Sequence, residues 1–169
     1  MKKIILLLLI FPAIAFSQVN LKGNTLIYIK TQNAITSEKS VGTTIGIVSS
    51  PVKDINGNVL IEENTPVTLN VVAVPAKSWG KPGTLIINAL STTAVDGQNI
   101  TLTGTYSTEG ADRKTMACGI SAALFVFIIL VGGLTGFFIK GGEAEVPSNY
   151  IFSNFYVASN TTVQLQTNK

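Results

Sequence analysis

The sequence predicts a mainly β fold: a small barrel or barrel-like sandwich of about seven or eight strands, with an apolar, hairpin-like helical insert before the last strands. Short segments of alternating apolar and polar side chains recur along the chain, for example VTLNVVAV from residue 67. Asn-Gly and Asp-Gly pairs, which suit tight hairpins, lie between such segments. One stretch, residues 116–139, has no charged side chain. Together these features indicate β structure interrupted by an apolar excursion.

The chain begins with a predicted signal peptide, residues 1–17. Lys2 and Lys3 precede an apolar run, and Ala15 and Ser17 supply the small residues that signal peptidase requires. Cleavage is expected between Ser17 and Gln18, although an uncleaved anchor is the alternative. Because the apolar run is short for a membrane span, we expect a cleaved leader rather than an anchor. The mature chain is then exported to the periplasm.

Composition excludes several functional classes. The chain has 12 basic and 9 acidic residues and no histidine, and its formal charge of +3 loses two units with the leader. No basic patch with interleaved aromatic residues remains, so we expect no nucleic-acid partner. Without histidine there is neither a Ser-His-Asp triad nor an imidazole metal site, and the single cysteine, Cys118, cannot form an intrachain disulfide. We expect no catalytic residue, no metal, no cofactor and no enzymatic activity.

The expected strands follow the alternating segments. They cover residues 25–30, 41–48, 59–61, 67–74, 84–93, 98–106, 144–147, 152–159 and 162–165. In the first, Ile27 and Ile29 share one face; the other face holds Leu26, Tyr28 and Lys30. In the second, Gly42 and Gly46 predict a bend or a bulge.

Turn chemistry connects these strands. Asn56-Gly57 follows Asp54 and suits a hairpin, and Asp96-Gly97 joins the strands at 84–93 and 98–106. In the latter hairpin Ile100, Leu102 and Gly104 are expected to share one face. The last strand is expected to close the barrel by pairing with an early strand.

The loop at residues 75–83 is a candidate contact site. It holds the only tryptophan, Trp79, between Lys77 and Lys81, a combination that suits a partner or a lipid interface. Alternatively, Trp79 folds back over the end of the barrel and closes its core.

The apolar insert, residues 115–140, is long enough to cross a bilayer as one helix. A single crossing would place Arg113 and Lys114 outside against Lys140 inside, contrary to the usual cytoplasmic excess of cations. A hairpin broken at Gly132-Gly133 would instead keep both ends in one compartment. Such a hairpin dips into the membrane, packs in an oligomer or covers its own domain; a helix packed over the barrel is a further alternative. The residues expected to contact the membrane or a partner are Leu124, Phe125, Phe127, Ile128, Phe137 and Phe138.

The predicted organisation is therefore a leader (1–17), a first part of the β domain (18–114), the insert (115–140) and the closing strands (141–169). Five short motifs follow one another along the chain. They are Gly42-Thr43-Thr44-Ile45, Asp54-Ile55-Asn56-Gly57-Asn58-Val59-Leu60-Ile61, Gly80-Lys81-Pro82-Gly83, Val95-Asp96-Gly97-Gln98 and Lys140-Gly141-Gly142-Glu143-Ala144-Glu145-Val146-Pro147.

In this order the motifs resemble a widespread family of small exported bacterial β proteins. More distantly, they are similar to the C-terminal barrel of the outer-membrane channel subunit of type IV secretion systems, whose helical antenna inserts in the membrane. The resemblance implies an oligomeric envelope protein with a membrane-seeking projection. The sequence departs from the family pattern at residues 62–64, Glu-Glu-Asn in place of Pro-Ala-Gly, and after Pro147, where Ser148-Asn149 replaces Gly.

The expected function is a non-enzymatic structural or interaction component of the cell envelope, associated with the membrane through the apolar insert, for example as a subunit of an outer-membrane or secretion-type assembly. It is expected at the outer rather than the inner membrane, with the membrane, other envelope proteins or further copies of itself as partners. The alternative is a periplasmic carrier that shields a lipid or another apolar ligand, with the insert as its lid.

Overall fold

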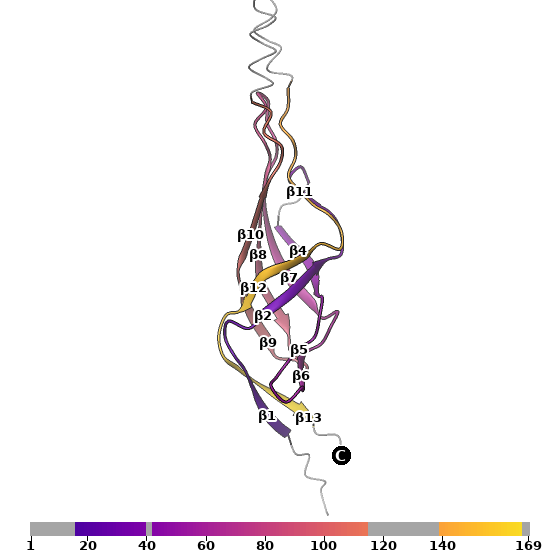
Figure 1. Ribbon diagram of the computed structural model, residues 1–169, viewed down its shortest axis with the longest axis vertical. Coiled ribbons are helices and arrows are strands. Elements are labelled where there is room, and N and C mark those ends of the chain that lie inside the picture. Colours follow the sequence, from indigo (N-terminus) through magenta and orange to yellow (C-terminus); the bar gives the residue numbers. More distant parts are fainter. Residues whose placement is uncertain (1–15, 40–41, 115–138, 167–169) are drawn as a thin grey trace, which may run out of the picture.

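The computed structural model describes residues 16–39, 42–114 and 139–166, and the elements within these ranges are thirteen β-strands (Figure 1). Their bounds are β1 (Phe16–Leu21), β2 (Leu26–Thr31), β3 (Ile35–Thr36), β4 (Gly42–Val48), β5 (Val52–Lys53), β6 (Val59–Ile61), β7 (Pro66–Val74), β8 (Thr84–Thr93), β9 (Asn99–Thr103), β10 (Thr105–Glu109), β11 (Glu145–Val146), β12 (Ile151–Val157) and β13 (Thr161–Gln166). Within these ranges, no helix is long and apolar enough to cross a bilayer. The expected helical insert, residues 115–140, lies outside the described residues except for Ile139 and Lys140, which belong to an irregular segment.

Six of the strands form a closed antiparallel barrel. The order is β8-β7-β4-β2-β12-β9, and β9 returns to pair with β8. The expected mainly β fold is therefore confirmed, with fewer strands in the barrel than predicted and the remaining strands outside it.

Strand β12 follows the apolar segment in the sequence. In the barrel sheet it lies between β2 and β9, two strands that precede that segment. Phe152 pairs with Ile29 of β2, and Val157 pairs with Leu102 of β9. Chain from both sides of the insert thus belongs to one sheet, as the sequence predicts.

The interior of the barrel is filled by every second side chain along each strand. Ile27 and Ile29 are fully buried, whereas Tyr28 between them is 42% exposed, as the alternation predicts. Phe152 and Phe155 stack edge to face at the centre, with ring centroids 5.3 Å apart. Burial of such large apolar side chains is the main stabilising contribution.

The barrel is not closed by the last strand, contrary to our expectation. Strand β13 pairs with β1 in a separate two-stranded sheet at one end of the molecule. Closure instead depends on Gly104, which divides the expected strand at residues 98–106 into β9 and β10. Its φ of 129° and its contact with Phe155 of β12 let β9 reach β12 while β10 continues along β8.

The structure also describes the strand around Gly46 and two turns that contain asparagine. The register of β4 is regular through Gly46, so no bulge lies there; a Cβ at this position would meet the side chains of Ile29 and Leu69 at 2.9 and 3.1 Å. In the turns that contain residues 62–64 and 148–149 an asparagine takes the left-handed conformation, Asn64 with φ 64° and Asn149 with φ 62°. Asparagine tolerates this conformation better than most residues, so these turns form without glycine.

The molecule is elongated. The β1–β13 sheet lies at one pole, and the chain beyond β7, β8 and β10 extends to the opposite pole beside the segment that leads into β11 (Figure 1). This second pole carries the two ends of the apolar insert.

Candidate functional site

Three chain segments form a narrow projection at the second pole, which we call the stalk: residues 76–83, 110–114 and 139–144. Each segment is hydrogen-bonded to the other two through the backbone. The Gly110 amide donates to the Gly83 carbonyl at 2.9 Å, and the Gly83 amide donates to the Gly142 carbonyl at 2.9 Å. The Gly142 amide in turn donates to Ala111 at 2.9 Å. Backbone hydrogen bonds therefore hold the three segments of the stalk together.

Glycine makes this close packing possible. A Cβ on Gly110 would collide with the Gly142 carbonyl, and a Cβ on Gly141 would collide with the Lys81 carbonyl. A Cβ on Gly80 would likewise collide with the backbone of Arg113, and its φ of 68° also disfavours side chains. These three glycines therefore permit the close approach of the stalk segments.

Both ends of the apolar insert meet at Gly80. The Arg113 amide donates to the Gly80 carbonyl at 2.9 Å, and the Gly80 amide donates to the Ile139 carbonyl at 2.8 Å. Because neighbouring backbones joined in this way lie about 5 Å apart, the segment at residues 114–139 leaves and returns at one point.

Glu143 links two segments of the stalk to the loop that follows β3. Its Oε2 accepts hydrogen bonds from the Ser37 hydroxyl at 2.6 Å and from the Ala76 amide at 3.0 Å. The Ser37 hydroxyl also accepts from the Ala144 amide at 2.9 Å, and Ser37 itself is buried. Beside this junction, β11 pairs with β3 through Val146 and Ile35.

The charge of Glu143 is stabilised by its neighbours. Its Oε1 lies 2.6 Å from the Lys140 ammonium, and this hydrogen bond, with those from Ser37 and Ala76, lowers the pKa of Glu143 to about 2. The same contact with Glu143 raises the pKa of Lys140. At the tip, the Lys114 amide donates to Asp112 at 2.9 Å, and this bond together with the Lys114 side chain lowers the pKa of Asp112.

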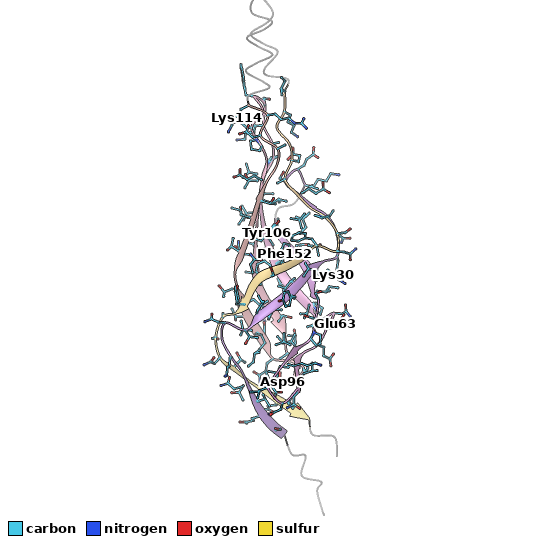
Figure 2. All side chains as sticks on the ribbon, viewed as in Figure 1. Lys30, Glu63, Asp96, Tyr106, Lys114 and Phe152 are labelled. Carbon is cyan, nitrogen blue, oxygen red and sulfur yellow. The ribbon has the colours of Figure 1, made fainter. Side chains whose placement is uncertain are left out.

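The stalk tip gathers cations. Five basic side chains belong to it, and we refer to them as the collar: Lys77, Lys81, Arg113, Lys114 and Lys140. All five are exposed. Figure 2 shows Lys114 at this pole and Asp96 toward the opposite one.

The structure places the predicted contact loop at the stalk tip. The Lys77 amide donates to the Lys81 carbonyl at 3.0 Å, so Lys77, Trp79 and Lys81 share one tight turn. Trp79 has φ 62° and is partly buried, but it is not among the residues packed against the barrel core. Residues 76–83 follow the stalk away from the barrel strands (Figure 1), and closure of the barrel by Trp79 stays a prediction. The six predicted contact residues of the insert, Leu124, Phe125, Phe127, Ile128, Phe137 and Phe138, lie outside the described residues.

Sequence reasoning missed Glu143 as a site residue. In the sequence Glu143 stands beside another carboxylate, Glu145. Its hydrogen-bond partner Ser37 is 106 residues away. The available signal was the spacing of Lys140 and Glu143, two opposite charges three residues apart.

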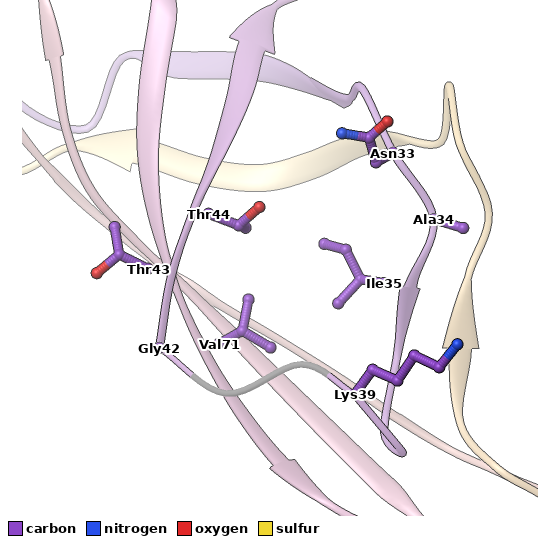
Figure 3. Close-up of a pocket in the computed structure, with 8 residues that line it drawn as sticks. All are labelled: Asn33, Ala34, Ile35, Lys39, Gly42, Thr43, Thr44 and Val71. Carbon is purple, nitrogen blue, oxygen red and sulfur yellow. The ribbon is translucent and has the colours of Figure 1, made fainter.

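The described surface includes two pockets of about 220 Å³ each. One lies between the β3 loop and the start of β4, where Ile35 and Thr44 point toward each other (Figure 3). The other lies near the opposite pole and is lined by Lys22, Lys53 and Leu60. Both are smaller than the roughly 300–1,000 Å³ typical of small-molecule sites.

Comparison with known proteins gives a distant structural likeness. No protein-family model matches the chain, and no curated protein matches it. Among solved structures, the chain is similar to ComB10 of the Com type IV secretion system of Helicobacter pylori, with 13% sequence identity and a TM-score of 0.43. The match covers 89% of this chain and 92% of that chain.

Proposed function

We propose that this protein is an exported, non-enzymatic component of the bacterial cell envelope that is held at the outer membrane by its apolar insert. In this proposal the barrel stands in the periplasm, where it contacts other envelope proteins or further copies of itself. The leader sequence supports export, and the uncharged segment at residues 116–139 supports membrane attachment.

One observation carries the proposal. Arg113 and Ile139 bond to the same residue, Gly80, and β12 lies between β2 and β9. An apolar segment that crossed a bilayer once would separate its ends by the hydrocarbon thickness of about 30 Å. The joined ends favour instead an insert that enters and leaves the membrane from one side.

The test replaces residues 115–138 with a short Gly-Ser linker. Because both ends meet at Gly80, a linker of about four residues, which spans up to roughly 13 Å, is long enough to bridge them. We expect the wild-type protein to stay in the membrane pellet after carbonate extraction and the linker variant to move to the soluble periplasmic fraction. Far-UV circular dichroism and thermal unfolding of the linker variant control for an intact barrel. A wild-type protein released by carbonate, or a linker variant that stays in the pellet, would contradict membrane attachment.

Cysteine labelling tests the topology separately. In a Cys118→Ser background, Ser78→Cys reports the stalk and Ser159→Cys reports the opposite end of the barrel; both serines are exposed. We expect a membrane-impermeant maleimide to label both positions once the outer membrane is permeabilised. Labelling of one position only, with the other reached after lysis, would place them in different compartments and refute the proposal.

A further inference from the structure

Charge is distributed unevenly between the stalk and the rest of the molecule. The stalk carries five cations and two carboxylates, Asp112 and Glu143, whereas the remaining chain after the leader carries five cations and seven carboxylates. The stalk is thus net positive by three and the remainder net negative by two, although the whole mature chain is nearly neutral. A positive field is therefore concentrated at the pole from which the apolar insert emerges.

Three collar cations have no acidic partner in the described part of the chain. Lys114 pairs with Asp112 at 3.1 Å and Lys140 pairs with Glu143 at 2.6 Å. For Lys77, Lys81 and Arg113, no carboxylate of the described residues lies within the ion-pair limit of 4.0 Å. The sequence of the insert itself contains no acidic residue that could pair with them.

The position of these cations would bring them close to the lipid headgroups. They lie on the segments that meet at Gly80, where the apolar insert departs, and the same turn carries Trp79. If the insert enters a bilayer, the first charged layer at the height of the stalk tip is that of the lipid phosphates. Lysine and arginine are attracted to anionic headgroups, and tryptophan favours the same interfacial layer.

We infer that the collar binds the phosphate groups of anionic phospholipids, so that the stalk tip lies in the headgroup layer and the long axis of the barrel stands away from the membrane. The inference rests on the proposed membrane attachment and adds a lipid class to it. Lys77, Lys81 and Arg113 supply the attraction, and Lys114 and Lys140 remain paired within the stalk.

Flotation of the full mature chain with lipid vesicles tests the inference. Vesicles of pure phosphatidylcholine are compared with vesicles that contain about 30% phosphatidylglycerol, whose anionic headgroups give the vesicle a negative surface potential. The test variant is Lys77→Gln/Lys81→Gln. The matched control is Lys22→Gln/Lys53→Gln, which makes the same charge change at two exposed lysines of the opposite pole.

We expect tighter binding to the anionic vesicles for the wild type and for the control. At about fivefold per cation near an anionic surface, the collar variant should lose about 25-fold of its partition coefficient on anionic vesicles. It should lose little on neutral ones. Raising the salt to about 1 M, where the screening length falls to about 3 Å, should abolish the preference for anionic vesicles. Emission of Trp79, the only tryptophan, should shift to the blue on anionic vesicles.

The outcomes separate this inference from the proposed function. Equal, salt-insensitive binding to both vesicle types with no loss in the collar variant would overturn the lipid inference and leave membrane attachment intact. An equal loss in the control variant would show a general charge effect and would also overturn it. Failure of the wild type to float with either vesicle type would refute the membrane attachment on which the inference rests.

Discussion

At the scale of single residues, Glu143 is the clearest link between the stalk and the loop that follows β3. Its carboxylate joins Lys140, Ser37 and Ala76, which belong to three different segments of the chain. Charge-assisted hydrogen bonds of this kind are stronger than neutral ones. The carboxylate thereby ties two segments of the stalk to the loop that follows β3.

This arrangement predicts a specific pH dependence. Because the folded-state pKa of Glu143, about 2, lies below the ordinary value of 4.5, its stabilising contribution is complete above about pH 4.5. The contribution is lost as the pH falls through about 2. We expect the melting temperature of the Glu143→Gln variant to fall less steeply than that of the wild type over this acid range. A Glu63→Gln variant, which makes the same charge change on a turn away from the stalk, controls for net charge, and equal slopes in all three proteins would contradict the prediction.

The stalk glycines predict a local steric effect. A Gly141→Ala substitution drives a methyl group into the Lys81 carbonyl, and overpacking of this kind costs about 1–3 kcal/mol. We expect Trp79 emission to report opening of the stalk in this variant before the circular dichroism of the barrel changes.

The control is Gly57→Ala, at a position with φ 86° and no atom within 4 Å of the added Cβ. It should cost about 1 kcal/mol through backbone strain and leave Trp79 emission unchanged at low urea. Identical emission profiles for the two variants would show that stalk packing does not depend on Gly141.

At the scale of elements, β12 decides whether the barrel closes. It supplies Phe152 and Phe155 to the core and pairs with strands that come from distant parts of the sequence. Its neighbouring side chains Phe155 and Tyr156 face opposite sides, the first fully buried and the second 38% exposed.

This alternation predicts unequal effects of two adjacent substitutions. Phe155→Ala should lower the free energy of unfolding by about 3–5 kcal/mol, because it leaves a cavity beside Phe152. Tyr156→Ala, on the outer face, should lower it by less than about 1 kcal/mol. Urea unfolding followed by circular dichroism measures both, and equal losses would mean that β12 is not seated in the barrel.

Strand positions and facing were predictable from the sequence, whereas strand partners were not. The alternation placed β2, β7 and β8 within one or two residues of their ends. The expected pairing of β13 with an early strand is confirmed, since β13 pairs with β1, but this pairing does not close the barrel, because the edge that β13 can reach is decided only in the folded chain. Asp96 contributes to that choice: its carboxylate accepts from the Gln164 amide at 2.8 Å and so occupies one edge of β13.

At the scale of the whole molecule, the barrel separates two poles with different roles. One pole holds the β1–β13 sheet, in which the first and last described strands pair, and the other holds the stalk. Strand β1 begins at Phe16, so cleavage between Ser17 and Gln18 would leave Gln18–Leu21 to pair with β13.

Removal of β1 should therefore weaken the molecule as a whole. A chain that starts at Lys22 loses Leu21, which is 2% exposed, and uncovers Val163 of β13. Loss of the Leu21 burial alone is worth about 1.5–3 kcal/mol. We expect a lower urea midpoint than for a chain that starts at Gln18, and equal midpoints would show that β1 does not contribute to the core.

The sequence by itself determined the class of fold, the inward faces of the strands and the presence of an uncharged insert, because hydrophobic alternation and charge depletion are properties of neighbouring residues. Only the tertiary structure decided that β9 and β12 close the barrel, that three glycine-rich segments form the stalk, and that Glu143 reaches Ser37. Each of these depends on chain segments tens of residues apart, whose approach is set by the packing of the complete core and not by local pattern.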